Sequence, residues 1–177
     1  MATDRSGFLE AAEKIGKLTV EALKIQYRLQ GHRLTGKLEK SIEYKTQETL
    51  EGAKVLILMQ DYGIVIDQGI KPSRIPYSGR GSGARRSKYI EGLKDFAKKR
   101  FGVSIKKATS IAFAIASAHK REGLSTRNSR KFSKTGKRQG AISAALLDTR
   151  QEAENLIFRA LQMSIELFFE QLIKETT

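Results

Sequence analysis

The sequence predicts an α+β protein: a long N-terminal helix, a small antiparallel β-sheet, two central helices and a long C-terminal helix. Three observations lead to this class. Long stretches near both ends and in the middle repeat apolar residues every three or four positions, as amphipathic helices do. Two short apolar stretches flank a glycine, which is typical of a β-hairpin. Glycines follow the helical stretches and would end them.

The first helix is expected to begin at Ser6, whose hydroxyl can cap free amide groups, and to end at Gly31. Its apolar residues recur at helical spacing and would form one stripe. They are Phe8, Ala12, Ile15, Leu18, Ala22, Ile25 and Leu29.

The two predicted strands cover residues 41–47 and 53–60. In the first, Ile42 and Tyr44 alternate with charged neighbours, whereas residues 55–59 form a continuous apolar run that suits a buried strand. Glu51 and Gly52 between them suit a tight hairpin turn. The next apolar run, residues 62–66, fits either a strand or a helix, because it is too short for periodicity to decide.

Residues 69–86 are expected to form an exposed, mobile loop, because they contain both prolines and several glycines. Within them, residues 79–83 read Gly-Arg-Gly-Ser-Gly and have the glycine content of a phosphate-binding loop. They lack the Gly-Lys-Ser/Thr ending of such loops. We therefore interpret them as a basic surface loop.

Two central helices should follow this loop. Ser87 can cap the first, which Gly102 would stop, and Ser104 can cap the second, which ends near Gly123. The apolar stripe of the second is rich in alanine, which allows another element to approach closely. Residues 124–140 are polar and basic, so we expect them to stay disordered unless something holds them.

The C-terminal helix is predicted for residues 148–177, since Asp148 and Gln151 have the spacing of a capping box. We accordingly divide the chain into a domain of residues 1–147 and this helix. One side of the helix carries Ile157, Leu161, Ile165, Phe168 and Leu172. This side is either a subunit interface or part of a core against the first helix, and the sequence leaves both interpretations open.

Positive charge is concentrated in the middle of the chain. Residues 71–140 hold 20 Lys and Arg against 3 acidic residues, a net charge of +17. Residues 1–70 hold 10 of each sign, and residues 141–177 hold 3 basic against 6 acidic residues. Such a band must face a polyanion, an acidic protein or open solvent. Because self-repulsion destabilises a compact state, we expect it to face a partner.

The strongest candidates for contact with a DNA channel or an acidic partner lie in the two basic loops, residues 71–86 and 124–140, and just after the first. Across 124–147 there is no acidic residue, a composition that phosphate contacts would explain. The candidates are Arg80, Arg85, Arg86, Lys88, Arg127, Arg130, Lys131, Lys134, Lys137 and Arg138.

No enzyme, cofactor or metal site is predicted. The two histidines, His32 and His119, belong to no triad or metal-binding motif, and the chain has no cysteine, which excludes disulfides and thiol catalysis. Asp61 and Asp67 bracket an apolar segment and are interpreted as turn residues. With no apolar run of about 18 residues and no basic start leading into one, we expect neither a membrane span nor a signal peptide.

Three stretches together resemble the head–tail joining proteins of tailed bacteriophages, also called tail-completion or neck proteins. Residues 34–42 (LTGKLEKSI) resemble the family's "TG-x-L-x-x-S-I" segment, and residues 62–69 (YGIVIDQG) resemble its "Y-x-x-x-(V/I)-(E/D)-x-G". Residues 89–93, 101–103, 112–116 and 120–123 are similar to a helix followed by an alanine-rich helix that ends at glycine. The resemblance covers roughly residues 6–126.

The resemblance implies a non-enzymatic α+β subunit of the virion, made in the host cytoplasm and assembled as a homo-oligomeric ring. Its partners would be copies of itself, the portal or adjacent connector and tail proteins, and the packaged double-stranded DNA of the channel. The basic loops and the long terminal helix depart from shorter members of the family. The alternative is a free-standing, sequence-independent nucleic-acid-binding protein, which the composition alone would also suit.

Overall fold

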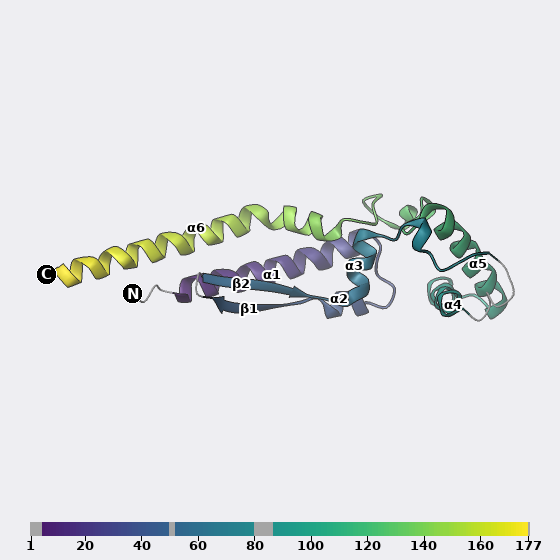
Figure 1. Ribbon diagram of the computed structural model, residues 1–177, viewed down its shortest axis with the longest axis horizontal. Coiled ribbons are helices and arrows are strands. Elements are labelled where there is room, and N and C mark those ends of the chain that lie inside the picture. The colour runs from purple at the N-terminus through teal and green to yellow at the C-terminus, as the bar shows by residue number, and fades with distance from the viewer. Residues whose placement is uncertain (1–4, 50–51, 80–86, 177) are drawn as a thin grey trace. The chain divides into compact units, whose positions relative to one another are not determined.

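The α+β class is confirmed in a computed structural model of the chain, which describes residues 5–49, 52–79 and 87–176 (Figure 1). The chain forms two compact units. The first unit contains residues 1–28, 38–60 and 141–177, and the second contains residues 29–37 and 61–140. Each unit therefore gathers segments that are distant in the sequence.

The first unit is built on helix α1 (Arg5–Leu29) and a hairpin of strands β1 (Glu43–Thr49) and β2 (Gly52–Leu58). The short helix α2 (Lys37–Ser41) leads into the hairpin. The strands pair antiparallel, with Tyr44 opposite Ile57. The predicted hairpin is thus confirmed, although Glu51 of its turn lies outside the described residues.

Alternation along the hairpin gives it one half-buried and one exposed face. Tyr44 and Ile57 are half-buried, and the ring of Tyr44 lies against Gly16 of α1. Leu56 and Leu58 point to the other face, and both are 36% exposed. The expectation of a fully buried second strand is therefore wrong. A two-stranded sheet covered by one helix leaves its second face uncovered.

The long helix α6 spans Ala141–Thr176, so the predicted start at Asp148 is wrong. Ala141 and Ala145 are fully buried, and the hydroxyl of Thr149 donates to the carbonyl of Ala145 inside the helix. Asp148 lies in the continuous helix and accepts a hydrogen bond from Gln26 of α1. Burial of small residues before position 148 extends the helix, and the division at 147/148 falls within it.

The second unit contains α3 (Asp61–Gln68), the 3-10 helices η1 (Pro72–Arg74) and η3 (Asn128–Phe132), and the helices α4 (Lys88–Phe101) and α5 (Ile105–Glu122). The ambiguous run at 62–66 is therefore helical. Ser104 caps α5 as predicted, and Gly102 ends α4 in the left-handed conformation at φ 61°. Ser87 precedes α4, but its side chain makes no capping hydrogen bond.

Part of the segment expected to be an exposed loop belongs to the core of the second unit. Ile75 and Tyr77 are 3% and 9% exposed and pack with Ile90, Ala112 and Phe113 of α4 and α5. The prolines and glycines do break regular structure here. Nevertheless, the apolar side chains between them bury themselves under the alanine-rich face of α5, which permits that close approach.

Substituting Gly16 by alanine tests the packing of α1 on the hairpin. An added Cβ would overlap the ring of Tyr44, and overpacking of this kind costs about 1–3 kcal/mol. At Gly92 of α4 an added Cβ meets nothing within 4 Å, so Gly92→Ala should stabilise by about 0.5–1 kcal/mol. Denaturant unfolding of both variants measures the difference, and equal effects would contradict the described packing.

Candidate functional site

The basic segment 124–140 is folded onto the rest of the second unit. The guanidinium of Arg138 donates to the carbonyls of Gly31 and Ser129, both at 3.3 Å, and to Nδ1 of His32 at 3.1 Å. The amide of Lys134 donates to the carbonyl of Leu29 at 2.7 Å. The expectation of disorder is therefore wrong. Hydrogen bonds to residues 29–32 replace the apolar contacts that the segment lacks.

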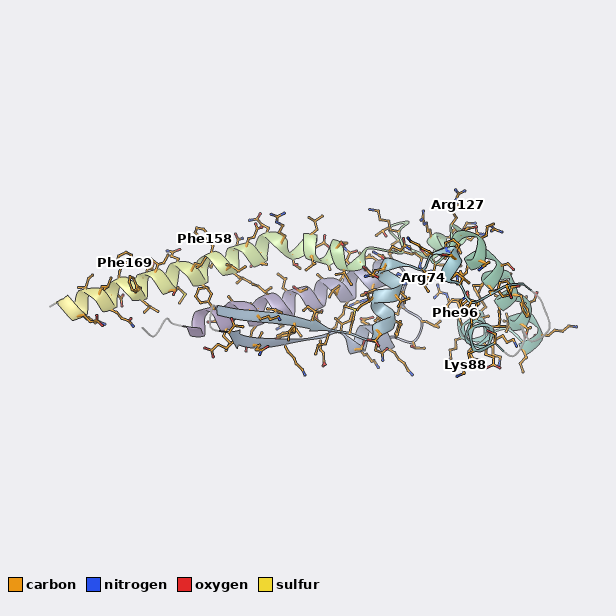
Figure 2. All side chains as sticks on the ribbon, in the orientation of Figure 1. Arg74, Lys88, Phe96, Arg127, Phe158 and Phe169 are labelled. Atoms are coloured by element: carbon orange, nitrogen blue, oxygen red, sulfur yellow. The ribbon has the colours of Figure 1, made fainter. Side chains whose placement is uncertain are left out.

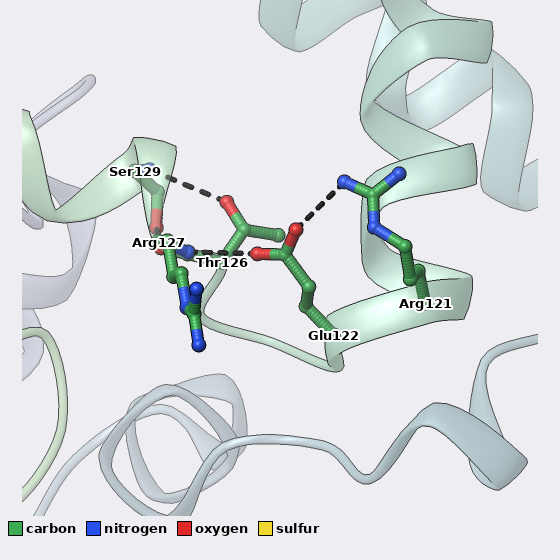
Figure 3. A network of polar contacts seen from close by, with 5 residues as sticks. All are labelled: Arg121, Glu122, Thr126, Arg127 and Ser129. Atoms are coloured by element: carbon green, nitrogen blue, oxygen red, sulfur yellow. Dashed lines mark hydrogen bonds and ion pairs between the residues drawn. The ribbon is translucent and has the colours of Figure 1, made fainter.

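Glu122 fixes the entry into this segment. Its carboxylate accepts from the side chain of Arg121 at 2.7 Å and from the backbone amide of Arg127 at 2.9 Å (Figure 3). These hydrogen bonds lower the pKa of Glu122 below its usual value, with the one from the Arg121 side chain acting most strongly. The side chain of Thr126 then accepts from the amide of Ser129, near the start of η3. The turn after α5 is thereby determined.

Most of the predicted contact residues in this segment are exposed. Five cationic side chains project into solvent from residues 127–137: Arg127, Arg130, Lys131, Lys134 and Lys137. Lys88 at the start of α4 is also exposed, and Figure 2 labels it together with Arg127. Arg80, Arg85 and Arg86 lie outside the described residues.

Arg138 differs from the other candidates. It is half-buried, and it holds the segment together rather than standing free for a partner. Burial, followed by the nearby charge of Arg100, lowers its pKa from the ordinary value. Its predicted contact with DNA or an acidic partner stays a prediction. Its role in the described fold is structural, and it also lines a cavity.

Charge is divided between the two units. The second unit holds 22 Lys and Arg against 5 acidic residues, a net charge of +17, while the first holds 11 against 14, a net of −3. The excess positive charge of the chain therefore belongs to the second unit. The second unit alone is the strongly cationic body.

A cavity of about 530 Å³ lies within the second unit, between α4, α5 and residues 31–34 and 124–138. Its apolar wall includes Leu34, Ile66, Leu93, Phe96, Phe101 and Phe132. Three arginines also line it, Arg33, Arg100 and Arg138, and none of the acidic residues that the structure describes does. The cavity is thus apolar with cationic groups in its wall.

Several of the lining side chains are still exposed. Phe96, Phe101 and Phe132 are 38%, 45% and 50% exposed. Phe96 and Phe101 meet edge to face with ring centroids 6.4 Å apart, and the guanidinium of Arg100 lies 5.3 Å from the centroid of Phe132. Aromatic rings at the mouth of a cavity are typical of a binding site for an apolar group.

Both histidines line this cavity in their neutral form. The Nε2–H group of His32 donates to the carbonyl of Arg138, and its Nδ1 accepts from the same residue. Burial and then the charge of Arg138 lower the pKa of His32 to about 4, although the backbone hydrogen bond opposes the shift. Nδ1 of His119 shares a hydrogen bond of 2.7 Å with the hydroxyl of Tyr89, and burial lowers the pKa of His119 too.

Two polar atoms of the cavity wall are buried without a hydrogen-bond partner in the described chain, the Nε of Arg138 and the hydroxyl of Ser125. The first is a donor that a carboxylate would satisfy. The described residues contain no group of three or more His, Cys, Asp or Glu able to hold a metal ion. The site is therefore suited to binding an acidic, apolar group.

The predicted interface side of α6 is uncovered. Ile157, Leu161, Ile165, Phe168 and Leu172 are each at least 41% exposed. Phe158 and Phe169 extend the same side, and Figure 2 shows both projecting from α6. Ala160, on the opposite side, is 4% exposed. Of the two interpretations left open, core packing of these five residues against α1 is not observed.

The cavity was not foreseen from the sequence. His32 and Arg138 of its wall are 106 residues apart in the sequence, and no motif links them. The available signal was the presence of phenylalanines in otherwise basic segments. Phe96 and Phe101 lie in α4, and Phe132 lies in η3. That signal does not reveal which segments meet.

Acidification should destabilise the fold through His32. Its pKa is lower in the folded chain than in the unfolded one. Below about pH 6.5 the His32 side chain therefore binds a proton in the unfolded chain but not in the folded chain. Stability should therefore fall as the pH drops toward about 4 and then lose this dependence. Thermal unfolding at about pH 7 and about pH 5 should show a smaller shift for His32→Gln than for the natural chain.

His119→Gln is a parallel test, because the pKa of His119 is lowered in the same direction. Each single variant should remove part of the acid sensitivity, and the double variant should remove more. An unchanged pH dependence in all three would contradict the neutral, buried state of these histidines.

No helix in residues 5–49, 52–79 and 87–176 combines the length and apolar character that crossing a membrane requires. Comparison of the chain with family models, with curated proteins and with solved structures found no match in any of the three.

Proposed function

We propose that this chain is a structural subunit of the virion of a tailed bacteriophage, assembled as a ring in the neck between portal and tail. In this proposal it has no catalytic role and surrounds the channel through which DNA passes. The observation that carries the assembly is the uncovered apolar side of α6. An exposed apolar patch of that extent on a protein surface marks an interaction site.

The charge of the second unit supports the position beside DNA or an acidic partner. Its net charge of +17 is sustained by exposed side chains such as Arg127, Arg130 and Lys131. Repeating one subunit around an axis sums this charge, so a ring would carry a strong positive potential. Phosphates or acidic protein surfaces would reduce the repulsion among these positive charges.

The motifs that resemble the head–tail joining family fall on defined elements, which supports the proposal further. Leu38 and Ile42 of the first motif are each 3% exposed and anchor α2. The second motif forms α3 and ends at Gly69, whose φ is 76°. The third covers α4 and the alanine-rich α5. Leu38, Ile42 and Gly69 therefore have a structural use in the described fold.

The proposal predicts that the protein is present at the neck of purified virions. Antibody labelling viewed by electron microscopy should mark the head–tail junction, and loss of the gene should leave unjoined heads and tails. Because the subunit would join preformed parts, heads should still package DNA. Normal, infective particles lacking the protein would contradict the proposal.

The exposed cations also favour a second candidate, a free-standing protein that binds nucleic acid without sequence preference. Such binding depends steeply on salt. The logarithm of the binding constant falls with the logarithm of the salt concentration, with a slope of about 0.9 for each phosphate contact. If the monomer works in this way, it should bind duplex DNA tightly on its own. Under the neck proposal, a single copy binds DNA weakly and assembly multiplies the contacts.

A triple variant identifies the surface that meets DNA in either case. Arg127→Gln, Arg130→Gln and Lys131→Gln together should weaken binding and reduce the salt slope by about 0.9 for each phosphate that is no longer neutralised. The matched control changes three cations of the first unit, Lys40, Lys45 and Lys54, to glutamine. Titration of labelled duplex DNA at several salt concentrations measures both. Equal weakening in the two variants would contradict a role for segment 124–140.

A further inference from the structure

We propose that the apolar end of α6 from one copy of this chain enters the cavity of the second unit in a neighbouring copy. The inference rests on the proposed ring assembly and deepens it, because it names the two surfaces that join the subunits. One surface is the stripe formed by Phe158, Leu161, Ile165, Phe168 and Phe169. The other is the aromatic mouth of the cavity.

The stripe has no covering element in the described chain. From Leu161 to Glu175 every residue is exposed except half-buried Ser164. Phe158 is 73% exposed and Phe169 is 58% exposed, and the rings of Phe168 and Phe169 touch edge to face at 5.9 Å. Their spacing of three and four residues places these side chains on one side of the helix. Such a helix is suited to binding in an apolar groove.

The helix end and the cavity are complementary in charge. From Phe158 to Thr176 the helix carries Glu166, Glu170 and Glu175 against Arg159 and Lys174. The cavity wall carries three arginines and no acid, and its two histidines are neutral. Two copies of α6 would bring like charges together if they paired with each other. Entry into the cavity instead brings Glu166 and Glu175, which flank the stripe, toward guanidinium groups.

The cavity wall also contains a buried polar atom without a partner in the part of the chain that the structure describes. The Nε of Arg138 is buried and has no hydrogen-bond partner in the described chain. A glutamate beside an apolar ring pairs a carboxylate, which the arginines of the wall attract, with an apolar side chain for the aromatic mouth. A small apolar molecule would fill the volume but leave these arginines without a counter-charge.

The reach of α6 suits a contact between copies. At 1.5 Å per residue, Phe169 lies about 42 Å along the helix axis from Ala141. A long projecting element that binds a different surface on the next subunit makes a head-to-tail contact. Such contacts repeat around an axis and close into a ring when the rotation permits.

Two variants, each lacking one of the two surfaces, test this contact. The helix variant is Phe168→Lys with Phe169→Lys, which removes both rings and adds positive charge. The cavity variant is Ala114→Trp, because Ala114 lines the cavity from an exposed position on α5 and an indole there would fill it. Native mass spectrometry of the full chain measures assembly. Each variant alone should be monomeric, with a dissociation constant raised about thirtyfold or more, as for a central aromatic anchor.

Mixing the two variants distinguishes a head-to-tail contact from every other arrangement. The intact helix of the cavity variant can enter the intact cavity of the helix variant, and no further chain can then add. The mixture should therefore form a two-chain complex and nothing larger. If α6 paired with α6, the cavity variant alone would assemble like the natural chain, which would overturn the inference.

Matched controls exclude loss of folding as the cause. Met163→Lys with Leu167→Lys changes two exposed apolar residues on the opposite side of α6, and Ser117→Trp adds an indole to α5 outside the cavity wall. Both controls should assemble normally. Should Ala114→Trp fail to fold, Arg100→Glu reverses a charge at an exposed position in the cavity wall and should also prevent assembly.

The outcomes separate this inference from the proposed function. Assembly of the natural chain that persists in the cavity variants overturns the contact but leaves ring formation intact. A natural chain that stays monomeric at every concentration tested contradicts both. A small molecule that binds the natural chain but not Ala114→Trp would assign the cavity to a ligand and overturn the contact.

Discussion

The second unit depends on the contact between Arg138 and residues 31–32. One guanidinium binds the carbonyls of Gly31 and Ser129 and the ring of His32, and so joins the end of the basic segment to the chain that follows α1. Without it, a segment with almost no apolar content has little reason to fold. With it, exposed cations such as Arg127 and Lys131 gain fixed positions, and a cavity forms behind them.

This contact brings a cost that explains the electrostatics of the site. Burial, and then the adjacent charge of Arg138, lower the pKa of His32 and keep its ring neutral. The cavity wall then holds arginines with no carboxylate to balance them. In our proposal, α6 of a neighbouring copy supplies the carboxylates and the apolar side chains that this cavity lacks. Both unsatisfied surfaces are explained by a single assembly.

The sequence predicted the fold class and the boundary between the two central helices well, because these depend on local signals. Gly102 stops α4 and Ser104 caps α5 through contacts within a few residues. It failed for features that depend on distant contacts. Asp148 has the spacing of a cap, yet buried alanines before it extend α6, and Ile75 and Tyr77 lie in a loop-like segment but are core residues.

The candidate site divides in the same way. Exposure of the cations at 127–137 followed from composition, since charged side chains rarely bury themselves without partners. The structural role of Arg138 and the joint position of His32 and His119 in one cavity did not follow. Both depend on contacts between residues that are about a hundred positions apart in the sequence. Periodicity and motif spacing carry no information on contacts of that separation.

The central claim is that one copy of this chain leaves its apolar helix side and its charge unsatisfied, so that it works only when assembled. Sedimentation of the natural protein over a range of concentrations tests this most directly. We predict a transition from the single chain of 19.8 kDa to one closed species of fixed size. A chain that remains monomeric across the range, with a stable α6, would contradict the account.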